Sequence, residues 1–462
     1  MNVNKPNMIF IFMDDMGWRD LGCSGSDFYE TPNIDALCRE GMTFDNAYAS
    51  CPVCSPSRAS AMTGRNPARV GITDWIDHHG KYHPCKGELI DAPYLKQLPH
   101  SEKTIAQYLK ASNYDTWHVG KWHLGEKGHH PQDFGFDVNV AGSFHGHPYQ
   151  GYFSPYGLDY LPEGPDGEFL TDRITDEAIR LIKNRTNKSF YLNLWEYAVH
   201  TPIQGKIKDV EYFTEKAKKL NLDKVNPIVC GEKFSFIQKE RCHVERRMFQ
   251  SNPEYAALIY NLDENIGRLV NTLKEEGIFD NTFIIFCSDN GGLSTAESSP
   301  TCNLPAREGK GWTNEGGLRV PMFAVWKDKI QSSTYSHRVI TTPDIFCSFL
   351  DAAGVSPDAE IQLDGVSFLP TLYGEIQENR KAAFWHYPHY GNQGGKPGAA
   401  VRLGEYKLIE FFNDYHIELY NVETDISEQI NLSEKMPEKV KELKALLHEW
   451  SKDVGAKYPI KP

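Results

Sequence analysis

Four apolar segments constrain the fold of this chain most strongly, because each ends abruptly in charged or amide side chains. They read MIFIFMDD (8–15), YDTWHVGKWH (114–123), SFYLNLWEYAVHTP (189–202) and TFIIFCSDNGG (282–292). Continuous apolar runs are typical of strands buried on both faces, as in a parallel sheet covered by helices. A helical pattern from Pro253 to Gly277 precedes the last run, with Leu258, Leu262, Leu269 and Leu273 on one face at helical spacing. The sequence therefore predicts an α/β fold.

The residues that could bind a ligand or act as acids and bases lie at the ends of these runs. Ligands of parallel α/β sheets bind beyond the carboxyl ends of the strands. We therefore expect one edge of the sheet to collect the polar residues that close the four runs, namely Asp14, Asp15, Lys121, His123, His200, Asp289 and Asn290. Any one of them could be an ordinary residue closing a strand, but their joint occurrence favours a site.

Length, charge and composition argue against nucleic-acid binding and membrane association. The chain has 462 residues, enough for a large domain and a smaller one, and its formal net charge is -13. Such acidity disfavours binding to nucleic acids or to anionic membranes. No apolar run reaches about 18 residues, so no segment is expected to span a membrane. The first residues do not resemble a signal peptide, so we expect a cytoplasmic protein or an exported one whose signal is absent from this sequence.

The cysteines raise a separate question at CPVCSPSRASAMTGR (51–65). Cys51 and Cys54 form a C-x-x-C pair, but a zinc site would need two further ligands at matched spacing, and no second such pair is present. A thioredoxin-like pair begins a helix in a small redox domain, whereas this chain is long. The ten cysteines are scattered, which indicates mostly reduced thiols.

The same stretch resembles a known family signature. Cys54-Ser55-Pro56-Ser57-Arg58, followed by Thr63-Gly64-Arg65, is similar to the signature of the type I, formylglycine-dependent sulfatases of the alkaline-phosphatase-like superfamily, with Met62 in place of the usual Leu. The order of further motifs strengthens the resemblance: GKWHLG (120–125), FGFD (134–137), SDNGG (288–292), GKGWTNEGGLRVP (309–321) and LDGVSFLPTL (363–372).

The resemblance implies a fold in two parts. Residues 1–372 would form the catalytic domain, a large, mixed and mostly parallel sheet sandwiched by helices. Residues 373–462 would form a small α+β subdomain with an antiparallel sheet and one helix. The sequence agrees with the second part, since short strand-like segments lead to a final amphipathic helix with Val440, Leu443 and Leu447 at helical spacing.

The resemblance also implies a modified residue and a metal. Cys54 would be oxidised by a separate formylglycine-generating or anaerobic sulfatase-maturating enzyme, and one hydroxyl of the hydrated aldehyde would be the nucleophile. The hard oxygen ligands suit Ca²⁺ or Mg²⁺, and the family pattern favours Ca²⁺. These ligands would be Asp14, Asp15, Asp289 and Asn290.

The remaining catalytic roles are assigned by position in the motifs. Arg58 would hold the diol, and Lys121 and Lys310 would pair with sulfate oxygens, giving an acidic protein a local positive field. His200 would protonate the leaving oxygen, and His123 would accept the proton from the second diol hydroxyl, which expels sulfate. Lys310, expected beside the same bridging oxygen, is the alternative acid.

Substrate identity rests on weaker signals. The segment HYPHYGNQGG (386–395) is rich in aromatic and hydrogen-bonding groups, and in this family it reaches toward the pocket mouth, so His386 and His389 are candidate substrate contacts. Trp75 is another, because an aromatic face can stack on a sugar. We expect a small anionic sulfate ester, most favourably a sulfated sugar. The alternatives are an aryl or steroid sulfatase, a phosphonate monoester hydrolase, or a non-catalytic binding protein that keeps the fold.

Overall fold

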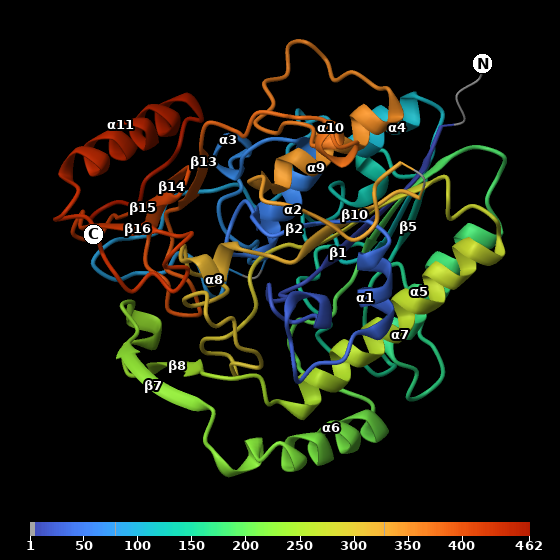
Figure 1. Ribbon diagram of the computed structural model, residues 1–462, viewed down its shortest axis with the longest axis horizontal. Coiled ribbons are helices and arrows are strands. Elements are labelled where there is room, and N and C mark those ends of the chain that lie inside the picture. Colours follow the sequence, from blue (N-terminus) through green and yellow to red (C-terminus); the bar gives the residue numbers. More distant parts are fainter. Residues whose placement is uncertain (1–4, 79, 328) are drawn as a thin grey trace.

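The computed structural model describes residues 5–78, 80–327 and 329–462, and an eight-stranded sheet forms its centre (Figure 1). The strand order is β11-β2-β10-β9-β1-β6-β4-β5. Strand β10 runs antiparallel to both of its neighbours, and the other pairings are parallel. In chain order the strands are β1 (Asn7–Met13), β2 (Met42–Phe44), β4 (Asp115–Gly120), β5 (Val138–Val140), β6 (Phe190–Trp195), β9 (Thr282–Ser288), β10 (Met322–Val325) and β11 (Thr334–Ser336). The predicted fold class and its four strands are confirmed.

Helices cover both faces of this sheet. Alternate residues of β1 enter two separate cores, with Ile9 and Ile11 in one and Phe10 and Phe12 in the other. The first core includes residues of α1 (Pro32–Arg39), α5 (Leu170–Lys183), α6 (Ile207–Lys219) and α7 (Pro253–Glu275). The second includes residues of α2 (Cys54–Thr63), α4 (Ile105–Ala111) and α9 (Thr342–Ala353). Burial on both faces explains why the central strands read as unbroken apolar runs.

A second sheet lies beside the first and belongs to the C-terminal part of the chain (Figure 1). It is antiparallel, in the order β13 (Ala383–Tyr387), β14 (Gly398–Leu403), β15 (Tyr406–Phe411) and β16 (Ile417–Asn421). The helix α11 (Pro437–Asp453) buries Leu443 and Leu447 in a core shared with β14 and β15. The predicted small α+β subdomain is thus present, whereas the boundary between 372 and 373 stays a prediction.

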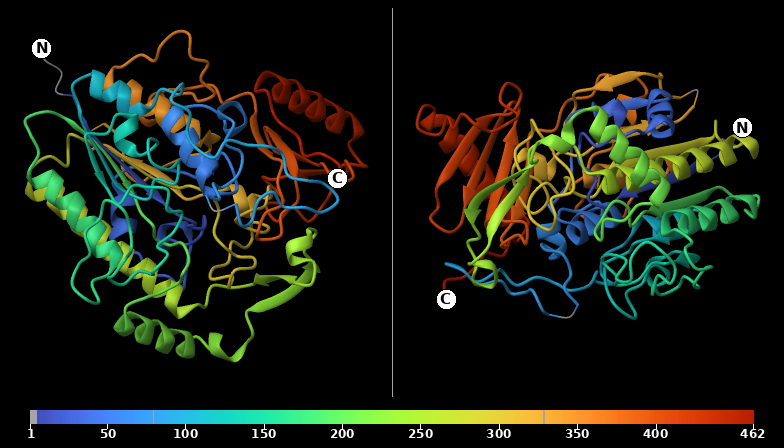
Figure 2. Two further views of the ribbon diagram at one scale, coloured as in Figure 1. Left: turned by 180° about the vertical axis from the view of Figure 1, so that it is seen from behind. Right: turned by 90° about the horizontal axis from the view of Figure 1, so that it is seen from below.

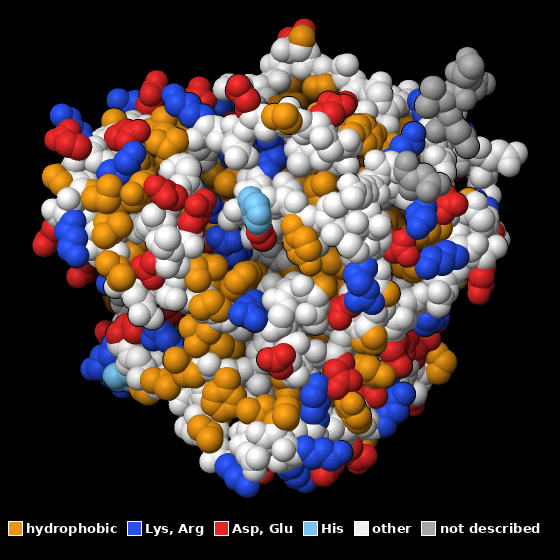
Figure 3. Space-filling view, in the orientation of Figure 1, with side chains coloured by type: hydrophobic (Ala, Val, Ile, Leu, Met, Phe, Trp, Pro, Cys, Tyr) orange, Lys and Arg blue, Asp and Glu red, His pale blue; other side chains and the backbone are white. Residues whose placement is uncertain are grey.

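Shorter elements complete the described chain. A hairpin of β7 (Ile228–Lys233) and β8 (His243–Arg247) follows α6. Val225, Val229 and Met248, in or next to this hairpin, are exposed. Apolar side chains gather in the lower left of Figure 3, the region in which Figure 1 shows the hairpin. The other elements are η1 (Gly22–Ser24), β3 (Ala47–Tyr48), α3 (Pro67–Val70), η2 (Pro131–Phe134), η3 (Leu222–Lys224), η4 (Ile237–Lys239), α8 (Glu315–Leu318), β12 (Ile340–Thr341) and α10 (Leu369–Leu372). Within the described ranges, no helix combines the length and apolarity that crossing a membrane requires.

A buried ion network joins the two parts. Lys407 of β15 has its ammonium 3.0 Å from a carboxylate oxygen of Glu315 in α8 and 3.0 Å from one of Glu428, and all three side chains are fully buried. Arg319 lies 2.8 Å from the other Glu315 oxygen, and the hydroxyl of Tyr48 donates to it over 2.8 Å. Because buried charges are costly unless they are paired, this network fixes the subdomain against α8.

Replacing Lys407 tests this anchor. Lys407→Met should lower the free energy of unfolding by about 3–5 kcal/mol, because the carboxylate of Glu428 would stay buried without its cation. The matched control is Lys439→Met, whose partner Glu442 is 51 % exposed, and it should change stability by about 0–1 kcal/mol. Urea unfolding of both variants measures the difference, and equal stabilities would contradict the anchoring role.

Candidate active site

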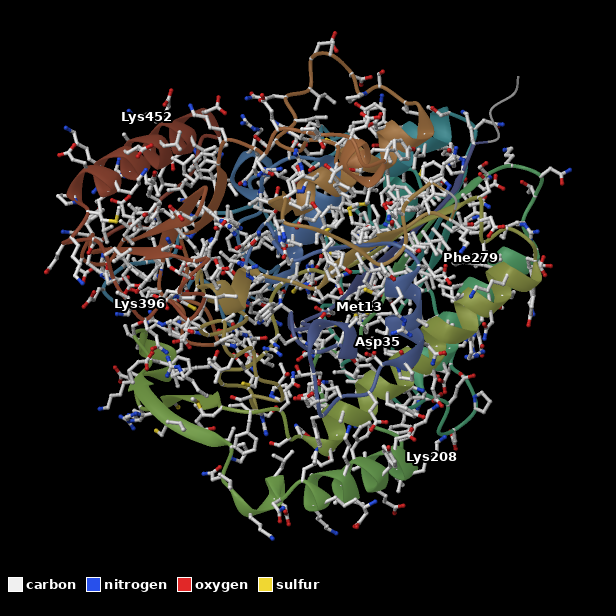
Figure 4. The ribbon with its side chains drawn as sticks, in the orientation of Figure 1. Met13, Asp35, Lys208, Phe279, Lys396 and Lys452 are labelled. Carbon is white, nitrogen blue, oxygen red and sulfur yellow. The ribbon has the colours of Figure 1, made fainter. Side chains whose placement is uncertain are left out.

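The carboxyl edge of the main sheet brings the polar residues of the four runs together. Backbone hydrogen bonds extend past the strand ends: the amide of Asp289 donates to Met13 O over 3.1 Å, and the amide of Lys121 donates to Trp195 O over 2.7 Å. The amide of Val199 donates to Asp14 O over 2.8 Å. In Figure 4, Met13 lies near the middle of the molecule, whereas Lys208, Lys396 and Lys452 lie at its periphery. The side chains of Asp14, Asp15, Asp289 and Asn290 are buried, so the cluster that follows β1 is enclosed.

Cys54 begins helix α2 and faces this edge. Its side chain is buried, and its Sγ lies 3.5 Å from Nδ1 of His123. The hydroxyl of Ser55 donates to His123 O over 2.9 Å, which fixes the two segments to each other. Burial raises the pKa of the Cys54 thiol, and the nearby Lys121 ammonium opposes that rise. Cys51 differs, since its Sγ points to Thr73 O at 3.9 Å and both cysteines are free thiols.

Arg58 lies one turn further along α2 and is fully buried. Its Nε and Nη2 each lie 2.9 Å from Oδ2 of Asp289, and its Nη1 donates to Lys121 O over 3.1 Å. The guanidinium also lies over the rings of Phe12 and Trp195, at 5.4 and 5.2 Å from their centroids. Arg58 therefore joins α2 to the ends of β9 and β4.

The carboxylates at the edge each have a cationic partner. Lys121 Nζ lies 2.6 Å from Oδ2 of Asp14, and Lys310 Nζ lies 2.7 Å from Oδ2 of Asp15. Burial and the neighbouring Asp14 raise the pKa of Asp289 to about 7. Burial also opposes ionisation of Asp15, but the Lys310 ammonium holds the pKa of that carboxyl below its usual range. The three carboxylates are thus balanced by Arg58 and two lysines.

The oxygen atoms of this cluster fit a hard cation. Oδ1 of Asp14 and Oδ1 of Asn290 are buried and have no hydrogen-bond partner, whereas Nδ2 of Asn290 donates to Asp15 over 2.9 Å. Ligand atoms of Asp14, Cys54 and Asp289 lie within 4.8 Å of one another, as do those of Asp14, Asp15 and His200. Unpartnered buried acceptors are uncommon, and carboxylate and amide oxygens are what Ca²⁺ and Mg²⁺ prefer. The residues present therefore fit a divalent ion.

His200 and Lys310 form a hydrogen-bonded pair beside Asp15. Nδ1 of His200 lies 2.9 Å from Thr201 O and can only donate to this carbonyl, so Nε2 carries the lone pair. Lys310 Nζ donates to that Nε2 over 2.9 Å. Burial and the Lys310 ammonium lower the pKa of His200 to about 3. The proton available at this position therefore lies on Lys310, one hydrogen bond from His200.

Two residues of the cluster adopt strained backbone conformations. Asp15 has φ of 63° and His123 has φ of 57°, the left-handed region that residues other than glycine seldom adopt. Such strain persists where the surrounding structure holds it, and it concentrates at functional sites. Gly146 supports His123 from the other side, because a Cβ there would lie 2.7 Å from its ring.

The structure buries two of the three predicted substrate contacts, His386 and His389, and the third, Trp75, stays a prediction. His386 lies within strand β13, and its Nε2 bonds to Lys457 O at 2.7 Å. His389 is fully buried and bonds to the hydroxyl of Thr73 at 2.8 Å. Both rings are buried and bonded to other residues of the chain, which argues against the predicted role as substrate contacts: His386 lies in β13, and His389 lies in the buried connection between β13 and β14. Trp75 is partly buried, with its ring 4.9 Å from that of His83.

Sequence reasoning missed a group of rings beside the site. The imidazole of His147 stacks on that of His200, with centroids 5.6 Å apart and planes at 9°. Tyr149, 47 % exposed, packs on His147 at 4.1 Å, and the ring of His78 lies 6.3 Å from that of His123. The only signal in the sequence was the density of rings in FHGHPY (144–149), which carries no spacing rule.

Known proteins resemble the chain over nearly its whole length. Residues 6–355 match the sequence model of the sulfatase family, and residues 309–454 match that of the C-terminal part of N-sulphoglucosamine sulphohydrolase. N-acetylgalactosamine-6-sulfatase of Mus musculus is 30 % identical over 98 % of this chain and 82 % of its own length. Arylsulfatase G of Canis lupus familiaris is 28 % identical, over 93 % of this chain and 81 % of its own.

A solved structure supports the same assignment. The structure of Ps i-CgsB in complex with k-i-k-neocarrahexaose superimposes with a TM-score of 0.77 at 28 % identity, over 97 % of this chain and 93 % of that one. The family match covers most of the described residues, including the signature at Cys54 and the edge of the sheet on which it lies. The chain therefore belongs to the sulfatase family, with the alkaline-phosphatase-like fold, and it is a sulfuric ester hydrolase.

Proposed function

We propose that the chain hydrolyses sulfate monoesters of sugars to an alcohol and inorganic sulfate, through a formylglycine formed from Cys54 and a covalent sulfo-enzyme intermediate. The observation that carries the proposal is the position of Cys54. It begins α2 with Sγ 3.5 Å from His123, and a ligand set of Asp14 and Asp289 lies within 4.8 Å. A nucleophile, a base and hard-metal ligands thus meet at one edge.

The names of the similar proteins favour sugar sulfates over other sulfate esters as the substrate. The Mus musculus relative is named for N-acetylgalactosamine 6-sulfate, and Ps i-CgsB was solved with an oligosaccharide. An aryl or steroid sulfate is the alternative, which arylsulfatase G supports at lower identity. The phosphonate monoester hydrolase of Agrobacterium radiobacter is 20 % identical and shares only the fold.

We further propose that Asp14, Asp15, Asp289 and Asn290 hold Ca²⁺, or Mg²⁺ in its place. Bound there, the ion would supply Lewis-acid stabilisation to sulfate oxygens. Lys121 and Lys310, which pair with Asp14 and Asp15, would contact other sulfate oxygens, and Arg58 would hold Asp289 in place. His123 would accept a proton at the position of residue 54. His200 would donate one to the leaving oxygen after taking it from Lys310 along their hydrogen bond.

Maturation of Cys54 is the first test. Peptide mass spectrometry of active enzyme should show formylglycine at residue 54 and an unmodified thiol at Cys51, because the signature begins at Cys54. Expression without a formylglycine-generating or anaerobic sulfatase-maturating enzyme should leave a thiol and low activity. Fully active protein that retains the Cys54 thiol would exclude this nucleophile.

Metal content is the second test. Elemental analysis should find one calcium or magnesium ion at the Asp14 cluster, and Asp289→Asn should lose both that ion and turnover, because one charged ligand is removed at nearly constant shape. Asp263→Asn, on α7 away from this edge, is the matched control and should keep the ion. An unchanged calcium and magnesium content in Asp289→Asn would contradict the ligand set.

The leaving-group role of His200 is the third test. General-acid assistance is typically worth about 10²–10⁴-fold, and it matters most when the leaving alkoxide is strongly basic. His200→Ala should therefore depress kcat/KM for a sugar sulfate far more than for a nitrophenyl sulfate. His123→Ala should slow both substrates alike and accumulate sulfated enzyme.

Comparing the two substrates also shows whether His200 or Lys310 donates the proton to the leaving oxygen. Equal losses on both substrates in His200→Ala would show that His200 binds sulfate without donating the proton. In that event Lys310→Ala should show the substrate-dependent loss, since its ammonium donates to the same Nε2.

A further inference from the structure

A second cluster of ligand-type side chains lies outside the catalytic edge. Asp74, His83, Asp91 and His389 converge there from two segments, and all four are buried. The catalytic roles assigned above use none of them. The loop that carries the first three passes beside the C-terminal subdomain, as the light-blue trace near the C-terminus shows in Figure 2, and the amide of Ile90 donates to Ile460 O over 2.8 Å.

The distances within this cluster match a tetrahedral metal site. Nδ1 of His83 lies 3.2 Å from Oδ2 of Asp91 and 3.4 Å from Oδ2 of Asp74. Nδ1 of His389 lies 3.7 Å from Oδ2 of Asp74 and 4.0 Å from Oδ1 of Asp91. Zinc binds imidazole and carboxylate ligands at about 2.0–2.2 Å, so neighbouring ligand atoms of a tetrahedron lie about 3.3–3.6 Å apart. The three distances to Oδ2 of Asp74 or Asp91 fall within about 0.1 Å of that range, and the 3.2 Å contact is also a hydrogen bond in this structure. The 4.0 Å distance is to the other oxygen of Asp91.

Two ligand atoms have no other use in the structure. Oδ2 of Asp74 and Nδ1 of His389 are buried without a hydrogen-bond partner, and their separation of 3.7 Å is too long for a hydrogen bond between them. Nε2 of His389 already bonds to the hydroxyl of Thr73. When this Nε2 carries the proton, a lone pair on Nδ1 faces two carboxylates, which is unfavourable unless a cation lies between them.

Further hydrogen bonds hold the carboxylates in place. Oδ1 of Asp74 accepts from the amide of Trp75 over 2.8 Å and from the hydroxyl of Tyr387 over 3.1 Å. Asp91 accepts from the amide of Cys85 over 2.6 Å and from that of Tyr390 over 3.1 Å. Such outer contacts orient the ligands of metal sites and leave the inner atoms free for the ion.

We propose that Asp74, His83, Asp91 and His389 bind one Zn²⁺, as a structural ion that ties the loop at 74–91 to the turn after β13. Two imidazole nitrogens with two carboxylate oxygens suit zinc, whereas Ca²⁺ and Mg²⁺ prefer oxygen ligands alone. Cys85 is near His83 and Asp91, but its Sγ points to Tyr82 O at 3.2 Å and is not a ligand. The alternative is a metal-free network in which His83 is an imidazolium between the two carboxylates.

Zinc binding by the full-length protein tests this proposal. Chelator-treated protein, dialysed against micromolar Zn²⁺, should retain one zinc per chain by elemental analysis. His389→Ala and Asp91→Asn should reduce that content at least tenfold. Cys85→Ser and His337→Ala, the latter removing an imidazole that is 84 % exposed, should retain it. Asp289→Asn should also retain zinc, which separates this site from the proposed catalytic ion.

A spectroscopic measurement keeps the test independent of how well the variants fold. Co²⁺ in place of zinc should give the intense visible absorption of a tetrahedral site in wild-type protein, without a thiolate charge-transfer band. Zinc should raise the Tm of stripped wild-type protein and leave that of His389→Ala unchanged. Wild-type protein that holds no stoichiometric zinc and gives no tetrahedral cobalt spectrum would establish the metal-free network and overturn the proposal.

Discussion

The pairing of three buried carboxylates with three buried cations at the carboxyl edge of the main sheet is the constraint on which the rest of the site depends. Each ion pair joins a different segment: Lys121 after β4 to Asp14 after β1, Arg58 of α2 to Asp289 after β9, and Lys310 to Asp15. Burying one member without its partner would cost several kcal/mol, so the segments are held in a single arrangement. The helix that begins with Cys54 is positioned by the same pairs, since Arg58 lies one turn after it. Stability and preorganisation of the site therefore have the same physical origin.

The C-terminal subdomain acts on this site through its attachment to the main domain. Lys407 pairs with Glu315, only five residues beyond Lys310, so docking of the second sheet orders the segment that supplies the proposed catalytic lysine. The proposed zinc cluster would attach the same subdomain at another point, beside Tyr387 and the loop that carries Trp75. Both attachments are buried, and neither places a subdomain side chain on the catalytic carboxylates. The subdomain in this account positions the active site, and it does not supply its chemistry.

Much of this arrangement could be predicted from the sequence, because strands buried on both faces read as unbroken apolar runs and parallel strands bring their ends to one edge. Asp14, Lys121, His200 and Asp289 were found in that way. The failures have physical reasons as well. His386 read as a residue of a polar loop, because the pairing that makes β13 a core strand comes from β14, which follows a ten-residue connection. His389 lies in that connection and is buried by contacts with a distant segment, including the hydroxyl of Thr73. The stacking of His147 on His200 and the cluster at Asp74 arise from tertiary contacts that no local spacing rule describes.

The central claim is that one enclosed, charge-balanced edge holds a sulfate ester between residue 54 and the His200–Lys310 pair. The most direct measurement is a crystal structure of the Cys54→Ser variant with a sulfated monosaccharide bound. The account predicts sulfate oxygens in contact with Lys121 and Lys310, the sulfur facing the side-chain oxygen of residue 54, and the bridging oxygen within hydrogen-bond distance of His200 or Lys310. A sugar sulfate bound elsewhere, or bound here with its bridging oxygen turned away from both residues, would contradict it.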